Sequence, residues 1–217
     1  MTQHPALAAD LIGSLAGTWR RLLVMGDSIA VGTGDPVPGF PDRSWAEQLV
    51  DALGHPEYLN LGQYGARAAE IRAGQLARAC AFRPDLAVVA AGANDALRRS
   101  FDDPAAQAAV ATELSRMVTA LHEAGALVVT FGCFDLGRTS FAPPDHRAGI
   151  SRRLRALGRL TEAITVRCGG VYVSFLDHPA TGDHLFSADG LHVNRRGHAL
   201  IAAEVVAALT RRLAPAS

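Results

Sequence analysis

The sequence predicts an α/β domain built on a parallel sheet that carries helices on both faces. Apolar runs of strand length alternate with longer segments of helical periodicity, and several of these runs are hydrophobic throughout, as strands buried on both faces are. A chain of 217 residues with 49% hydrophobic and 19% charged residues has the length and composition of one such domain. We therefore expect a single domain over residues 1–217.

The predicted elements follow one another in a regular order. The chain opens with a helical extension over residues 1–19, which contains an amphipathic helix from about Pro5 to Gly17. The apolar runs predict strands at residues 21–25, 57–61, 85–91, 126–132 and 170–176. Helices are predicted between and after them, at residues 44–53, 68–82, 104–124, 147–167 and 196–213. Ser44 and Glu47 have the spacing of a capping box.

Charge and hydropathy narrow the range of partners. The 21 basic residues balance 21 acidic ones, so the chain lacks the net positive charge that gathers nucleic acids or anionic membranes. No apolar run reaches membrane-spanning length, and no Lys or Arg precedes the apolar segment around Asp10 as it does in a secretory signal. We expect a cytoplasmic protein without a nucleic-acid partner or stable membrane insertion, and with a small, weakly charged substrate.

Polar residues gather in the segments that follow the predicted strands. Gly26-Asp27-Ser28 follows the first strand, Gly92-Ala93-Asn94-Asp95 the third, and Asp189-Gly190-Leu191-His192 comes after the fifth. The carboxyl ends of parallel strands meet at one edge of the sheet, which is where ligands bind in such folds. A serine hydroxyl is a weak nucleophile that needs an imidazole base and a third group to orient that base. Ser28, His192 and Asp189 are therefore the predicted catalytic triad.

Two further residues match the needs of acyl transfer. The tetrahedral intermediate requires hydrogen-bond donors aimed at its oxyanion, and either a backbone N–H in a glycine turn or a side-chain amide provides one. Gly65 follows the second strand and Asn94 the third. Both are expected at the same sheet edge as Ser28, where they would form an oxyanion hole.

These four segments together resemble the sequence blocks of the SGNH/GDSL hydrolase superfamily. Ser28 matches its serine in GDS, Gly65 its block glycine, Asn94 its asparagine in GxND, and Asp189 with His192 its DxxH. The resemblance implies a flavodoxin-like three-layer α/β/α fold, an acyl-serine intermediate, and no metal or organic cofactor. It also implies that the Ser28 backbone N–H joins the oxyanion hole. Ile29 stands where many relatives have leucine, a change that keeps the position apolar.

The substrate is the least determined feature, because this superfamily includes carboxylesterases, lysophospholipases, thioesterases and carbohydrate deacetylases. The neutral net charge favours a small soluble ester over a membrane lipid. Our hypothesis is a short acyl ester, such as an acetyl ester, of a small molecule or sugar, with a lysophospholipid or acyl thioester as alternatives. Tyr64, Arg67 and Phe134 are candidate substrate-binding residues, although Arg67 has the spacing to pair with Glu70 instead. The segment 135–146 is either a lid or a wall of the site.

Several competing interpretations remain at this stage. The other serine-hydrolase fold needs GxSxG, and Ala30 replaces its second glycine. A nucleotide- or flavin-binding module would need a GxGxxG turn or a P-loop, which the first strand lacks. Ser28 and Asn94 could act only as helix caps. His178, His184 and His198, like the three widely spaced cysteines, lack the spacing of a zinc site, so we expect no metal and reduced thiols at Cys80, Cys133 and Cys168.

Overall fold

A five-stranded parallel sheet forms the centre of the molecule. The computed structural model describes residues 15–214, so most of the predicted helix from Pro5 to Gly17 lies outside the described residues. The strands occur in the order β2-β1-β3-β4-β5, and every neighbouring pair is parallel. Their bounds are β1 Arg21–Gly26, β2 Glu57–Asn60, β3 Leu86–Ala90, β4 Leu127–Phe131 and β5 Val171–Val173. Each predicted strand is confirmed, with β5 shorter than expected.

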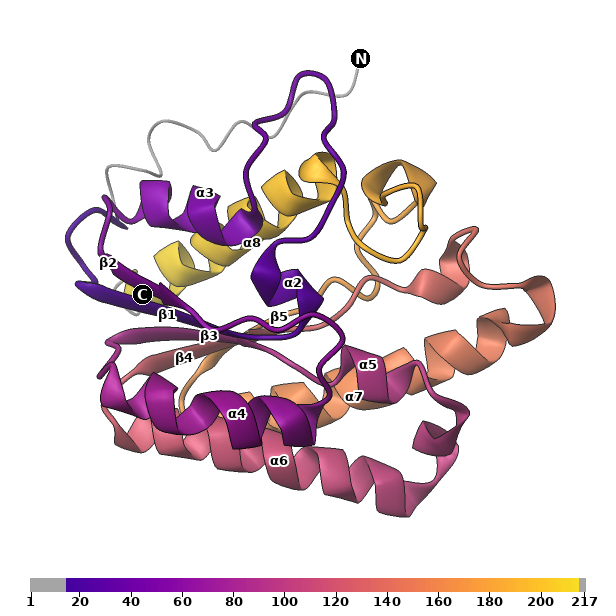
Figure 1. Cartoon of the computed structure of the whole chain (residues 1–217), viewed down its shortest axis with the longest axis horizontal. Coiled ribbons are helices and arrows are strands. Elements are labelled where there is room, and N and C mark those ends of the chain that lie inside the picture. Colours follow the sequence, from indigo (N-terminus) through magenta and orange to yellow (C-terminus); the bar gives the residue numbers. More distant parts are fainter. Residues whose placement is uncertain (1–14, 215–217) are drawn as a thin grey trace.

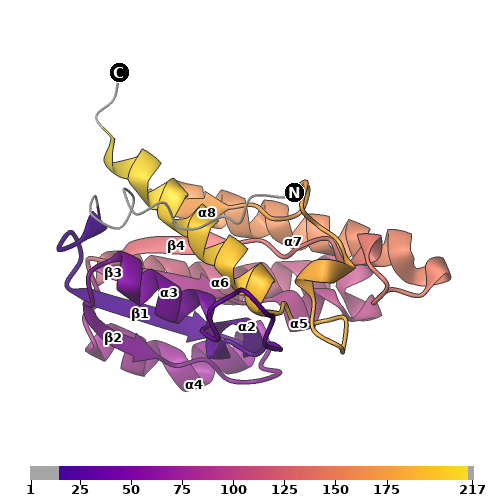
Figure 2. The same ribbon diagram turned by 90° about the horizontal axis from the view of Figure 1, so that it is seen from above.

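Helices cover both faces of this sheet and complete three layers (Figure 1). The helix α3 (Trp45–Ala52) packs beside α8 (Arg195–Leu213) on one face, and Figure 2 shows this pair from above. On the other face lie α4 (Ala68–Ala81), α6 (Pro104–Glu123) and α7 (Arg147–Arg167). The three-layer α/β/α sandwich predicted from the sequence is therefore confirmed.

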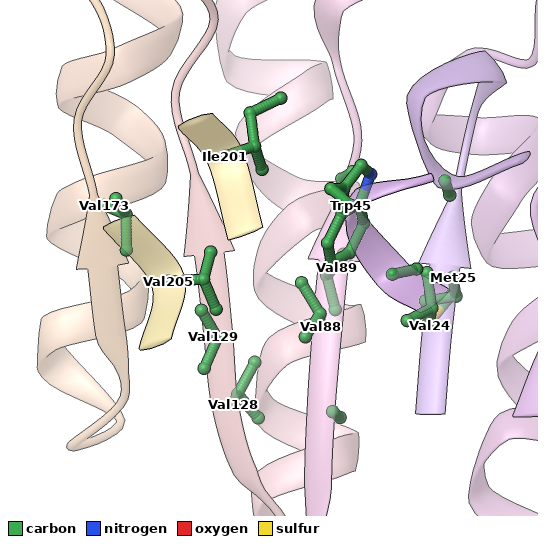
Figure 3. Close-up of a cluster of buried hydrophobic side chains, with 14 of the residues drawn as sticks. Val24, Met25, Trp45, Val88, Val89, Val128, Val129, Val173, Ile201 and Val205 are labelled. Carbon is green, nitrogen blue, oxygen red and sulfur yellow. The ribbon is translucent and has the colours of Figure 1, made fainter. Parts of the chain in front are cut away.

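The sheet is apolar because helices bury it on both sides. Every side chain of β3 is buried, and β1 is buried from Leu22 to Gly26. Figure 3 shows Trp45 of α3 with Ile201 and Val205 of α8 beside the valines of the strands. Burying one such side chain stabilises a fold by about 1.5–3 kcal/mol, so this continuous cluster dominates the stability of the domain.

The structure adds short elements that have no detectable periodicity in the sequence. The one-turn helices α2 (Ser28–Val31) and α5 (Ala93–Ala96) begin just beyond the ends of β1 and β3. Four 3-10 helices lie in other connections: η1 Arg99–Asp102, η2 Leu136–Arg138, η3 Pro144–His146 and η4 Asp183–Leu185. A single turn is too short to display a hydrophobic period, which is why these elements were not predicted. The expected capping box of Ser44 and Glu47 is present at the start of α3.

The end of β1 is fixed by a buried side chain from α4. Gln75 accepts a hydrogen bond from the Gly26 backbone N–H and donates one to the Gly26 carbonyl oxygen, both at 2.9 Å. Gly26 allows β1 to pass close to β3, since an added Cβ would lie 2.0 Å from the Ala90 carbonyl oxygen. Ser28 follows two residues later, so Gln75 also determines where the serine-bearing turn begins.

Gln75→Leu is expected to lower the free energy of unfolding by about 2 kcal/mol, because it leaves the buried Gly26 N–H without an acceptor. Urea unfolding followed by circular dichroism measures this change. Gln107→Leu is the matched control, since the Gln107 amide donates to the Phe101 carbonyl from a more exposed position. Equal losses of stability in the two variants would contradict the role given to Gln75.

Candidate active site

Ser28 is held at the carboxyl end of β1 by the residues on either side of it. It is the first residue of α2, and the Asp27 side chain caps this helix by accepting a 3.0 Å hydrogen bond from the Ile29 N–H. The Trp45 indole N–H donates to the Ile29 carbonyl oxygen at 2.7 Å. The short helix is thus anchored to the strand on one side and to α3 on the other, which fixes the position of the serine hydroxyl.

His192 and Asp189 lie in one turn immediately before α8 and extend the hydrogen bonding from Ser28. His192 Nε2 lies 3.0 Å from Ser28 Oγ, and His192 Nδ1 lies 2.6 Å from Asp189 Oδ2. Pairing with a carboxylate makes Nδ1 the proton donor, so Nε2 is free to accept the serine hydroxyl proton. The structure therefore brings the three predicted triad residues into one continuous chain of hydrogen bonds.

Asp189 is oriented by the backbone of its own turn. Its Oδ1 accepts hydrogen bonds from the N–H groups of Leu191 at 2.9 Å and His192 at 3.0 Å. Partial burial acts to raise the pKa of Asp189, but these bonds and the one to the His192 ring outweigh it, so the pKa is lowered overall. The carboxylate therefore stays ionised at neutral pH. Its side chain is 48% exposed, and contact with water also favours the charged form.

Several hydrogen bonds hold the histidine segment against the serine segment. Ser187 Oγ accepts from the Asp35 N–H, and Asp35 Oδ2 accepts from the Ala188 N–H at 2.8 Å. Arg195, the first residue of α8, donates to the Gly32 carbonyl oxygen just after α2. His198, which is fully buried, contacts the Thr33 carbonyl oxygen through Nε2 at 3.1 Å. Together they maintain the distance between two residues that are 164 positions apart.

The predicted oxyanion donors are the backbone N–H groups of Ser28 and Gly65 and the side-chain amide of Asn94. The Asn94 side-chain amide donates to the Ala66 carbonyl oxygen at 3.0 Å, so it contacts the loop that contains Gly65. Within residues 15–214, the backbone N–H groups of Ser28 and Gly65 donate no hydrogen bond. These N–H groups remain available for an oxygen of the substrate.

Asp27 is a site residue whose properties the sequence did not reveal. Its side chain is buried, and burial raises its pKa to about 6 despite the opposing effects of the Ile29 N–H and His192. Its Oδ2 lies 3.5 Å from Asn94 Nδ2, so it faces the oxyanion side of the site. Its position before Ser28 in the GDS turn was the one available signal.

The other predicted binding residues occupy different parts of the site. The Tyr64 ring is 64% exposed and lies 5.2 Å from the His192 ring, centroid to centroid. Phe134 is buried and lines a cavity that also contacts Ser28 and His192. Arg67 lies at the start of α4, where it pairs with Glu70 at 3.4 Å, as the alternative interpretation expected.

The segment 135–146 is anchored rather than free. The buried Asp135 carboxylate accepts from the Ser151 hydroxyl of α7 at 2.6 Å and from the Gly137 N–H. The Ser140 N–H donates to Asp183 at 2.7 Å. The segment therefore forms a wall between α7 and the segment that leads to His192.

The other histidines and the cysteines of residues 15–214 form no cluster with the geometry of metal ligands. His178 lies 3.8 Å from Glu204, and His184 is exposed. No group of three or more His, Cys, Asp or Glu residues suited to a metal ion occurs in the described part of the chain. The three cysteines are unpaired and partly buried at the edge of the core.

Comparison with known proteins agrees with this arrangement. The sequence profile of the GDSL-like lipase/acylhydrolase family matches residues 24–200, which include Ser28 and His192. The chain belongs to the GDSL-like lipase/acylhydrolase family. A GDSL-like esterase of Mycobacterium tuberculosis is 31% identical over 203 residues, covering 85% of this chain and 62% of that protein. The chain thus spans about six tenths of the length of that relative.

Solved structures of two hydrolases share the fold. A lipase/acylhydrolase from Enterococcus faecalis superposes with a TM-score of 0.67 at 23% identity, covering 91% of this chain and 99% of that one. An acetylxylan esterase from Geobacillus stearothermophilus gives 0.69 at 18% identity, covering 89% and 94%. At these identities the likeness establishes the three-layer fold alone.

Among residues 15–214, none of the helices combines the length and the apolar composition that crossing a bilayer requires.

The buried His198 predicts a specific dependence of stability on pH. Burial lowers its pKa from 6.5 to about 4, while the bond to Thr33 acts in the opposite direction. The pKa of His198 is lower in the folded protein than in the unfolded chain. The contribution of neutral His198 to the free energy of unfolding is therefore complete above pH 6.5 and is lost as the pH falls towards 4. The loss amounts to about 3 kcal/mol over this window. Asp27, with its raised pKa, acts in the opposite direction.

The variant His198→Gln isolates this contribution, because the effect of Asp27 is common to both proteins. The difference in unfolding free energy between wild type and His198→Gln is expected to shrink by about 3 kcal/mol from pH 7 to pH 4. Urea titrations at several pH values measure it. A difference that stays constant across this range would show that His198 does not titrate as described.

Proposed function

We propose that this protein is a serine esterase in which Ser28 is the nucleophile, His192 the general base and Asp189 the group that orients His192. The 3.0 Å contact between His192 Nε2 and Ser28 Oγ is the observation that supports this assignment best. Ser28 Oγ attacks the ester carbonyl carbon as its proton passes to Nε2. His192 then returns that proton to the leaving alcohol, which leaves an acyl group on Ser28.

A water molecule completes the reaction by the same route. His192 takes a proton from the water, whose oxygen attacks the acyl carbon and releases the carboxylic acid and the free Ser28 hydroxyl. In both steps the carbonyl oxygen becomes an oxyanion. The Ser28 and Gly65 N–H groups and the Asn94 amide stabilise this charge. Asn94 is prepositioned by its bond to the Ala66 carbonyl oxygen.

The proposed substrates are short acyl esters, such as acetyl esters, of a small molecule or sugar. The balanced net charge and the family of ester hydrolases support this class. The acetylxylan esterase among the structures of the same fold illustrates one substrate of this kind. Long-chain lysophospholipids and acyl thioesters are the alternatives, and a panel of nitrophenyl esters of increasing chain length beside acetylated sugars and an acyl thioester separates them.

Ser28→Ala is expected to reduce ester hydrolysis by at least about 10⁴-fold, because no other group in the site replaces the nucleophile. A fluorophosphonate probe should label wild type at Ser28, shown by peptide mass spectrometry, and should not label the variant. Ser100→Ala, at an exposed serine, serves as the control and should retain both properties. Labelling at another residue, or co-purified flavin without labelling, would contradict the proposal.

Asn94→Ala is expected to lower kcat/KM by about 10²–10³-fold, since it removes one of the three oxyanion donors. Labelling of Ser28 by the fluorophosphonate should persist at a reduced rate, because the triad is intact. Equal turnover by wild type and Asn94→Ala would show that the oxyanion assignment is wrong even if the triad is right.

A further inference from the structure

A cavity of about 110 Å³ opens beside Ser28 and extends into the molecule. Ser28, Asn94 and His192 line its mouth. Leu154, Leu157 and Thr161 of α7 line its side. Because α7 runs from the carboxyl edge of the sheet back towards the amino edge, Thr161 lies deepest of these three. The cavity therefore extends from the reacting atoms down into the layer between the strand ends and α7.

The wall of this cavity is apolar and buried. Phe134, Phe175 and Phe186 form one aromatic side, with the Phe134 ring 4.9 Å from Phe175 and 6.1 Å from Phe186 between centroids. The Thr161 hydroxyl donates to the Leu157 carbonyl oxygen at 2.9 Å, so it offers no free donor to a ligand. Such a wall suits a hydrocarbon chain.

The titratable groups that line the cavity leave it suited to an uncharged chain. They are Asp27, Cys133 and His192, and no Lys or Arg of residues 15–214 lines the cavity. Burial raises the pKa of Cys133 to about 12, so its thiol stays neutral. A carboxylate at the end of a substrate chain would find no cation here and would be repelled by Asp27.

The order of the reaction indicates which half of an ester occupies the cavity. The alcohol must leave before water attacks, whereas the acyl chain stays on Ser28 through both steps. Outside the cavity, Tyr64 beside the His192 ring and the Asp189 carboxylate are exposed to solvent. The leaving alcohol therefore departs past Tyr64, and the acyl chain occupies the enclosed side.

The volume of the cavity sets the length of that chain. An engineered cavity of about 150 Å³ holds benzene, so a cavity of this size holds roughly four carbon atoms beyond the reacting carbonyl. Resting on the function proposed above, and narrowing its short acyl esters to those with chains longer than acetyl, we propose that the cavity binds an uncharged acyl chain of about four to six carbons and that Thr161 at its floor limits this length.

Nitrophenyl esters from acetate to octanoate test this specificity. In wild type, kcat/KM should rise about fourfold for each methylene up to pentanoate or hexanoate and then fall. Thr161→Leu fills the floor, because a leucine side chain on a helix points back towards its N-terminus and so into the cavity. The ratio of kcat/KM for pentanoate over acetate should drop at least about tenfold.

Thr210→Leu is the matched control for this substitution. Thr210 makes the same hydroxyl bond to a carbonyl oxygen one turn earlier, at 2.9 Å in α8, but it does not line the cavity. The pentanoate-to-acetate ratio should stay at the wild-type value in this variant. Thr161→Leu should also unfold at the same temperature as wild type or higher, since it fills empty space.

Cys133→Ala tests the same idea in the opposite direction and does not depend on Thr161→Leu folding. Removing the Cys133 thiol enlarges the cavity and should move the optimum to a longer chain, whereas Cys80→Ala, at a cysteine outside the cavity, should not. If wild type is labelled at Ser28 and cleaves esters but neither variant moves the chain-length optimum, the assignment of the cavity is wrong while the esterase proposal stands. Absence of both labelling and turnover in wild type contradicts the esterase proposal itself.

Discussion

The candidate site depends on one constraint, which is that the segment after β1 and the segment before α8 are held together. No strand pairing joins them, since β1 lies between β2 and β3 in the sheet. Hydrogen bonds that involve Asp35, Arg195 and His198 hold the two segments together instead, and the two backbones are in close contact. An added Cβ at Gly34 would lie 2.1 Å from the Val193 carbonyl oxygen, so only glycine permits this approach. The 3.0 Å separation of Ser28 and His192 follows from this packing.

Burial has opposite consequences for the two carboxylates of the site. Asp189 is half-exposed, accepts several hydrogen bonds and keeps a lowered pKa, which suits a group that must remain negative beside an imidazolium. Asp27 is almost fully buried, and its pKa rises to about 6. Its role at the cap of α2 does not require full ionisation, because a neutral carboxyl oxygen also accepts a hydrogen bond from the Ile29 N–H. Two acids near one serine thus serve different purposes.

In the proposed function, the acyl and alcohol halves of an ester would occupy different environments beside Ser28. The enclosed side combines α7 with the aromatic residues of the connections after β4 and β5. Because Asp135 ties the segment 135–146 to α7, that wall is part of the folded scaffold. In the proposed function, the substrate preference would therefore depend on helix packing as much as on the residues of the four sequence blocks.

The sequence by itself determined the alternation of strands and helices, the parallel sheet and the residue types needed for acyl transfer, because hydrophobic periodicity and short polar motifs are local properties. The predicted bounds of α7 and α3 agree with the structure to within a residue or two. The site residues remain predictions, but Ser28, His192 and Asp189 do lie in one hydrogen-bonded chain. Only the tertiary structure decided the burial of Asp27 and His198 and the cavity above Thr161. These features arise where segments far apart in sequence pack together, and no local pattern encodes the space left between them.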